Sequence, residues 1–428
     1  MNKKTFLKGQ LYINYLGPFS ALLGNLIATP ILISNLGLEE WSLFALINIL
    51  LPLVSLILFG SSFFVGRLMI NIFLGNEKTK KSITMFYKHE QKIFGRFIVS
   101  IIFLTIALIL LNSNNYPSFE TIELTFFFAS IAVLIKIFEL YYGELLNGLK
   151  EHYKLHLSGF VVTISKWLSI IYLSSQSDVN INILLLTLII FSLILIIIQR
   201  LFILNVFNKK NNYTNDIDKK IISEFKENNF GIIIFLILIL QQFNNVLVFG
   251  ILDPIKLSYF GIALLLSTSI PLIFSPIVGY LTPEIYEKVE IKSKDRVKYF
   301  SKLIISQFVI LIIPLITINL YLEEILNLWL GNSLDSQEVS TYLIPLSISM
   351  LSISLLNSLR ILYIAENKIA YMKNPLLLIF FIFVFLAIII YLNILTPQIY
   401  LYCLSISIFV LMLYLCFNFF IKKIYKNN

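Results

Sequence analysis

The chain has 428 residues, of which 58% are hydrophobic and only 13% are charged, and its mean hydropathy is +0.86. Soluble globular chains are roughly 25% charged, and a water-soluble core of this size could not bury so much apolar surface. The net charge of +9 does not require a nucleic-acid partner, because the basic loops of a membrane protein account for it. These values predict a multi-pass membrane protein that binds no nucleic acid.

Hydrophobic runs that cross a bilayer as helices need about 20 residues. Twelve runs of this kind follow one another along the chain: 11–36, 41–70, 93–111, 122–146, 155–173, 181–207, 230–252, 257–281, 303–322, 342–364, 375–392 and 399–421. Helices are expected because lipid offers no hydrogen-bond partner to the backbone, and the alternating pattern of a membrane barrel is absent. The predicted fold is therefore an all-α integral membrane protein with 12 transmembrane helices.

Basic residues alternate sharply between the two sets of predicted loops. Of the 33 Lys and Arg residues, 26 fall in the two tails and in every second loop, whereas the opposite loops contain one, Lys256. Cytoplasmic loops of membrane proteins are enriched in Lys and Arg. Both termini are therefore predicted to be cytoplasmic.

The longest connection on the basic side, residues 208–229, divides the twelve predicted helices into two sets of six. We predict an N-terminal lobe at 1–207, a cytoplasmic linker at 208–229 and a C-terminal lobe at 230–428. Similar pentapeptides open the second predicted helix of each lobe, at 41–45 and 257–261. Two parallel halves around a central cavity are a common transporter plan.

Six cations lie inside predicted helices. Arg96 and Arg200 are close to cytoplasmic ends, and the other four are Arg67, Lys136, Lys166 and Arg360. An ionised side chain at the bilayer centre costs about 2.5–3.5 kcal/mol on insertion scales, so it usually faces a cavity or a partner. Lining a water-filled cavity, these cations would bind an anion such as pyrophosphate. They are the predicted substrate-binding residues.

Two acidic residues near Lys136 offer a different interpretation. Glu139 lies three residues away on the same helix face, and Glu144 lies further toward the cytoplasm. Either acid could form an ion pair or act in gating. Pairing of Lys136 with Glu139 would leave no need for a ligand at Lys136.

Amides in the second half are further candidates for the cavity: Gln241, Gln242, Asn244, Asn245 and Asn357. Such groups can bind sugar hydroxyls or join neighbouring helices. Tyr141, Tyr142, Trp167 and Trp329 could stack on sugars or anchor the protein at the lipid interface, and Arg200 is interpreted as an anchor near a cytoplasmic end.

Catalytic chemistry has no sequence support. The three histidines and two cysteines have no metal-ligand spacing, and no nucleotide-hydrolysis motif is present. We therefore expect no metal, no cofactor and no enzymatic activity, with any transport energised by ion or substrate gradients.

Several short stretches, in order along the whole chain, resemble the polysaccharide-unit flippases of the multidrug/oligosaccharidyl-lipid/polysaccharide (MOP) exporter superfamily, in the O-antigen (Wzx-type) branch. They lie at residues 25–37, 39–45, 59–67, 74–77, 146–149, 283–286, 324–331 and 364–368, and the stretch 324–331, Glu-Ile-Leu-Asn-Leu-Trp-Leu-Gly, is the most recognisable. One departure is that Leu58 and Phe59 precede Gly60, where family members often have an acidic residue.

The resemblance implies a flippase in the bacterial cytoplasmic (inner) membrane. Its substrate would be an oligosaccharide repeat unit linked to undecaprenyl pyrophosphate, for O-antigen or capsular polysaccharide biosynthesis. The implied partners are this substrate, membrane lipids, a coupling ion (H+ or Na+) and polysaccharide polymerase machinery. The alternatives are an ion-coupled multidrug or metabolite antiporter of the same superfamily and, ranked below it, a membrane-embedded glycosyltransferase or polymerase.

Overall fold

A computed structural model describes most of the chain. The described residues are 3–50, 79–112, 122–148, 151–176, 180–209, 236, 252–269, 271–272, 296–331, 334–365, 369–392 and 395–424. Most of the predicted second and seventh helices and the end of the eighth lie outside these ranges, as does nearly all of the predicted linker.

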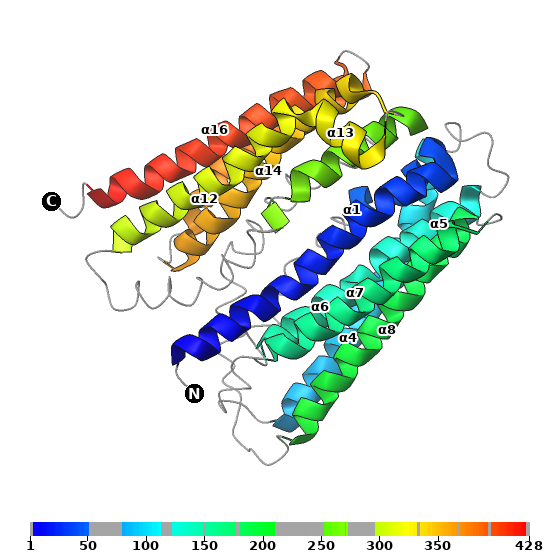
Figure 1. Ribbon diagram of the computed structural model, residues 1–428. Coiled ribbons are helices and arrows are strands. Elements are labelled where there is room, and N and C mark those ends of the chain that lie inside the picture. The colour runs from blue at the N-terminus through cyan, green and yellow to red at the C-terminus, as the bar shows by residue number, and fades with distance from the viewer. Residues whose placement is uncertain are drawn as a thin grey trace. The chain divides into compact units, whose positions relative to one another are not determined.

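The described residues form helices in two compact units (Figure 1). The first unit contains α1 (Lys3–Leu50), α4 (Thr79–Asn112), α5 (Ile122–Leu134), α6 (Lys136–Gly148), α7 (His152–Ser174) and α8 (Ile181–Lys209). Its most extensive contact joins α1 to α7, and α8 packs on α5, α6 and α7. Only part of each apolar helix is buried inside the unit, which leaves the exposed apolar side chains to the membrane.

The second unit contains the remaining named helices. These are α12 (Arg296–Leu320), α13 (Leu322–Leu330), α14 (Ser336–Ala365), the short 3₁₀ helix η2 (Ile369–Met372), α15 (Lys373–Tyr391) and α16 (Pro397–Ile424). Helix α14 packs on both α12 and α16. Polar side chains join these helices: Gln307 Nε2 lies 3.0 Å from Ser354 Oγ, and the hydroxyls of Ser349 and Ser405 are 2.8 Å apart.

Nine helices among the described residues are long and apolar enough to cross a membrane. A nearly all-helical, multi-pass membrane protein agrees with the prediction from composition. The count of 12 helices, the arrangement of the lobes and the cytoplasmic termini stay predictions.

The predicted loop between the first two helices is reduced to a kink. Helix α1 continues from Lys3 to Leu50, interrupted only at Gly37, where φ is 80° and ψ is 170°. This backbone region is nearly restricted to glycine. Residues after Gly37 return at once to helix, and Trp41 and Leu43 are buried in the first unit.

The predicted helix 122–146 is instead divided at Ile135 into α5 and α6. The amide of Phe138 donates to the carbonyl of Ile135 over 3.1 Å, a three-residue step in place of the four-residue step of an α-helix. No proline or glycine marks this break in the sequence. Its consequence is that Lys136 is the first residue of α6 and Glu139 lies in its first turn.

The sequence also predicted a loop from 323 to 341, and this is wrong for its first part. The chain turns at Tyr321, whose φ of −110° and ψ of 29° are not helical, and then forms α13. Helix α13 ends at Gly331, where φ is +73° and the amide donates to the carbonyl of Asn327 over 3.1 Å. Glycine has no Cβ, so it adopts this positive φ without the steric cost that other residues would meet.

Candidate functional site

Two predicted site residues form an ion pair at the start of α6. Lys136 Nζ lies 2.5 Å from Glu139 Oε1, and the two side chains are 25% and 15% exposed. The pair spans one helical turn, as the i,i+3 spacing allows. Lys136 therefore has a carboxylate partner within its own helix.

Lys166 on α7 differs from Lys136 in its partners. Its ammonium lies 4.6 Å from the centroid of the Trp167 ring, and it interacts electrostatically with both Lys136 and Glu139. Within the described residues, no carboxylate lies close enough to Lys166 to form an ion pair. The cluster thus contains two lysine amines and one carboxylate, which amounts to one excess positive charge when all three groups are ionised.

The ring that supports Lys166 is fixed by α1. Trp167 is only 7% exposed, and a Cβ added to Gly24 would lie 1.9 Å from its Cδ1 atom. The ring also contacts Phe44, with the centroids 6.2 Å apart. Trp167 is thus packed between helices of the first unit, so interpreting it as a lipid-facing anchor is wrong. Glycine at position 24 is what allows α1 and α7 to approach so closely.

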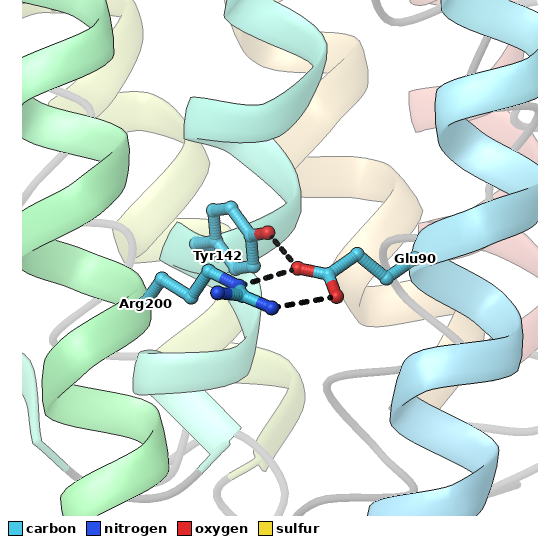
Figure 2. Close-up of polar contacts among 3 residues, drawn as sticks. All are labelled: Glu90, Tyr142 and Arg200. Carbon is cyan, nitrogen blue, oxygen red and sulfur yellow. Dashed lines mark hydrogen bonds and ion pairs between the residues drawn. The ribbon is translucent and has the colours of Figure 1, made fainter.

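A second polar cluster joins three helices of the first unit (Figure 2). Glu90 on α4 accepts hydrogen bonds from Arg200 on α8, with Nε 2.8 Å from Oε1 and Nη2 3.3 Å from Oε2. The hydroxyl of Tyr142 on α6 also donates to Oε1 of Glu90. A forked, two-point contact between guanidinium and carboxylate is geometrically specific. The Glu90 cluster, as we call these three residues, therefore fixes α6 against α4 and α8.

The Glu90 cluster changes the interpretation of two residues. Arg200 was predicted to be an anchor, but it is bound to Glu90, and the adjacent Tyr141 and Tyr142 are buried. Glu90 itself was missed because the predicted helix began at residue 93, whereas α4 begins at Thr79. No local sequence signal connects Glu90 with Arg200, which lies 110 residues away.

Replacing Glu90 with alanine is expected to lower the melting temperature of the purified protein. Glu90 is 17% exposed at its side chain and Arg200 is 41% exposed, so solvent screens the pair partly. The decrease in the free energy of unfolding should lie between the values for exposed and for buried ion pairs, at about 1–3 kcal/mol. Tyr142→Phe, which removes one donor, should cost about 1 kcal/mol.

The matched control is Glu123→Ala, because Glu123 on α5 is exposed and has no hydrogen-bond partner among the described residues. Thermal unfolding in detergent, followed by size-exclusion chromatography, measures each variant. Equal melting temperatures for the Glu90 and Glu123 variants would show that the Glu90 cluster does not stabilise the unit.

The remaining predicted site residues are more scattered. Asn357 and Arg360 lie on α14 in the second unit, where both are partly buried. Glu144 lies in α6, but its side chain is not described. Outside the described residues lie the other predicted members of the site: Arg67, Gln241, Gln242, Asn244 and Asn245. Among the described site residues of the first unit, the structure brings together Lys136, Glu139 and Lys166.

Metal-ligating groups do not gather in the described part of the chain. No group of three or more His, Cys, Asp and Glu side chains there could hold a metal ion. Cys403 and Cys416, both on α16, are free.

Comparison with known proteins gives a uniform result for the fold. No protein-family model matches the chain, and no curated protein matches its sequence. Among solved structures, the lipid II flippase MurJ in an inward closed conformation matches with a TM-score of 0.63 at 15% identity, covering 97% of this chain and 87% of that one. The eukaryotic MATE transporter AtDTX14 matches with a TM-score of 0.62 at 12% identity, covering 96% and 94%.

A third solved structure matches the chain over a similar length. The MATE multidrug transporter DinF-BH, solved in complex with a ligand, matches with a TM-score of 0.59 at 15% identity, covering 97% of this chain and 96% of that one. At these identities the likeness establishes the fold. The chain has the same fold as these solved transporters and as another that is titled as a member of the MOP superfamily, and this is the fold that the resemblance implies.

Proposed function

We propose that the protein is a flippase of the Wzx type. It moves an oligosaccharide repeat unit linked to undecaprenyl pyrophosphate across the bacterial cytoplasmic membrane, for O-antigen or capsular polysaccharide biosynthesis. Two lobes of six helices alternate between inward and outward openings, with both termini in the cytoplasm. The polyprenyl tail stays in lipid while the headgroup crosses through a cationic cavity.

The observation that carries this proposal is the cluster of Lys136, Glu139 and Lys166, in which two lysines share one carboxylate. An unpartnered anion is very costly to bring into a membrane interior. Lys166 has no carboxylate in ion-pair contact among the described residues, so its ammonium is available to compensate one substrate phosphate. Lys136 lies next to it and can join only by sharing or leaving Glu139.

The fold supports a transporter, but transporters for two different kinds of cargo have this fold. The solved structures that match include one titled as a lipid II flippase and others titled as MATE transporters, one of them a multidrug transporter. An ion-coupled antiporter of multidrug or metabolite substrates is therefore the second candidate. A carrier of cationic drugs should present carboxylates without cationic partners inside the membrane, whereas Glu139 is paired with Lys136.

Leaflet-resolved flipping in vesicles tests the proposal directly. Purified protein is reconstituted with a fluorescent undecaprenyl-pyrophosphate oligosaccharide, and a membrane-impermeant reagent that modifies the sugar reports its leaflet over time. We expect protein-dependent exchange of the labelled lipid between leaflets. Protein-free vesicles and a labelled phospholipid control for leakage and for general scrambling.

The same vesicles distinguish the flippase from the ion-coupled antiporter. Flipping that is absent with the oligosaccharide lipid, together with gradient-driven movement of a cationic fluorescent dye, would favour the antiporter. For whichever substrate moves, its transport rate under H+ and Na+ gradients imposed in either direction identifies the coupling ion.

A further inference from the structure

The connection after α12 is a helix with three distinct faces. Helix α13 follows the candidate membrane span Tyr299–Leu320 with only Tyr321 between them. Figure 1 shows it as a short helix at the far end of α12, near α14. Its position in the chain therefore places it at the depth where α12 leaves the membrane.

One face of α13 packs on its own unit. Leu322 and Leu326, four residues apart, are 5% and 1% exposed, and α13 contacts both α12 and α14. Residues at this spacing share one side of a helix. This face is accounted for by protein contacts.

A second face is polar. Glu323 and Asn327 are also four residues apart, and both are exposed. Glu324, likewise exposed, borders this face and lies one turn before Leu328. These side chains form no hydrogen bond with any other described side chain. Carboxylates at this position are best solvated by water, because an ionised group in hydrocarbon is costly.

Between these two faces lies an apolar edge that no described residue covers. Leu328 is 93% exposed, and Tyr321, the residue that precedes the helix, is 56% exposed. Contact with water would leave the whole Leu328 side chain hydrated, which is unfavourable relative to burial. An apolar medium on this side would remove that cost.

The apolar edge continues a stripe on α12. The exposed residues Ile305, Val309, Ile313, Ile316 and Leu320 recur every three or four positions on α12. Because α12 is a candidate membrane span, this stripe is its lipid-facing side. Leu320 is 72% exposed and leads directly into Tyr321. The lipid surface that covers α12 therefore reaches the edge of α13.

We propose that α13 is an interfacial helix whose Tyr321–Leu328 edge lies in the boundary between acyl chains and headgroups. It lies on the side of the membrane opposite the basic start of α12, where Arg296, Lys298 and Lys302 are found. An amphipathic helix in this position buries its apolar edge in the bilayer and keeps its charges in water. Three neighbours, protein, lipid and water, thus match the three faces of α13.

Spin labels at single cysteines test this placement. In a background of Cys403→Ser and Cys416→Ser, the labelled variants are Leu328→Cys, Glu323→Cys and, as a lipid-facing reference on α12, Ile313→Cys. All three positions are exposed, so labelling should leave the fold intact. The protein is reconstituted in vesicles of phosphatidylcholine and phosphatidylglycerol. Collision rates with oxygen, which concentrates in lipid, and with a water-soluble nickel chelate are then compared.

We expect the label at Leu328 to collide more with oxygen than with the chelate, as at Ile313, and the label at Glu323 to show the reverse. Equal chelate access at Leu328 and Glu323 would overturn the proposal and make α13 a water-exposed loop helix. Low access of both reagents at Leu328 would also overturn it, because that edge would then be covered by protein and not by lipid.

Discussion

Replacing Lys166 with alanine should slow flipping of the oligosaccharide lipid by about 10- to 100-fold at low substrate concentration. A contact with a charged group contributes about 1.5–3 kcal/mol, and each 1.4 kcal/mol is a factor of ten. The reason for choosing Lys166 is that no carboxylate in the described structure pairs with its ammonium. Lys166→Arg keeps the charge and should retain more activity than Lys166→Ala.

The control lies on the same helix. Lys154 Nζ is 3.1 Å from Glu151 Oε2 and also faces the Phe202 ring, so it has local partners of its own. Lys154→Ala should leave flipping within a few-fold of the unmodified protein. Equal rates for Lys166→Ala and Lys154→Ala, at equal protein levels in the vesicles, would remove Lys166 from the substrate site.

The ion pair beside Lys166 offers a charge-count experiment. Lys136→Ala leaves Glu139 without its partner and brings the cluster to zero net charge, so flipping should fall. Adding Glu139→Gln to Lys136→Ala restores one excess positive charge, and flipping should recover. If the double variant is as slow as Lys136→Ala alone, restoring the net charge is not sufficient. Lys136 would then act by contacting the substrate directly.

Replacing Gly24 with alanine should have its largest effect on folding. The added Cβ would lie 1.9 Å from Cδ1 and 2.2 Å from Nε1 of Trp167, which is far inside contact distance. Trp167 is 7% exposed and packed on Phe44, so it has little room to move. Overpacking of this kind costs about 1–3 kcal/mol, and separation of α1 from α7 would also displace Lys166. We expect a lower melting temperature and less folded protein in the membrane.

Gly159→Ala on α7 is the matched control, because a Cβ there would meet nothing within 4 Å. Alanine stabilises a helix by about 0.5–1 kcal/mol relative to glycine. This variant should therefore be at least as stable as the unmodified protein. Trp167→Leu, which removes part of the ring, should partly restore the stability of Gly24→Ala. Equal melting temperatures for the Gly24 and Gly159 variants would contradict the close packing of α1 on α7.

Part of the candidate site could be predicted because its contacts are local. Lys136 and Glu139 lie three residues apart on one helix, so their pairing follows from helical geometry. The break at Ile135 could not be predicted, because neither proline nor glycine marks it. The packing of Trp167 on Gly24 joins residues far apart in the sequence, and the Glu90 cluster joins three helices. No local pattern encodes such contacts.

The sequence by itself determined that this is a helical membrane protein, where most of its apolar helices lie, and that cations occur within them. These properties depend on the transfer free energy of each side chain between water and lipid, which adds up along a local window of the chain. Only the tertiary structure decided which cation lacks a carboxylate partner among the described residues, which glycine meets the tryptophan, and that the chain after α12 forms a helix with an exposed apolar edge. Those features depend on how each helix is rotated about its axis and which neighbour it meets, and hydropathy does not specify either in a bundle whose outer surface is also apolar.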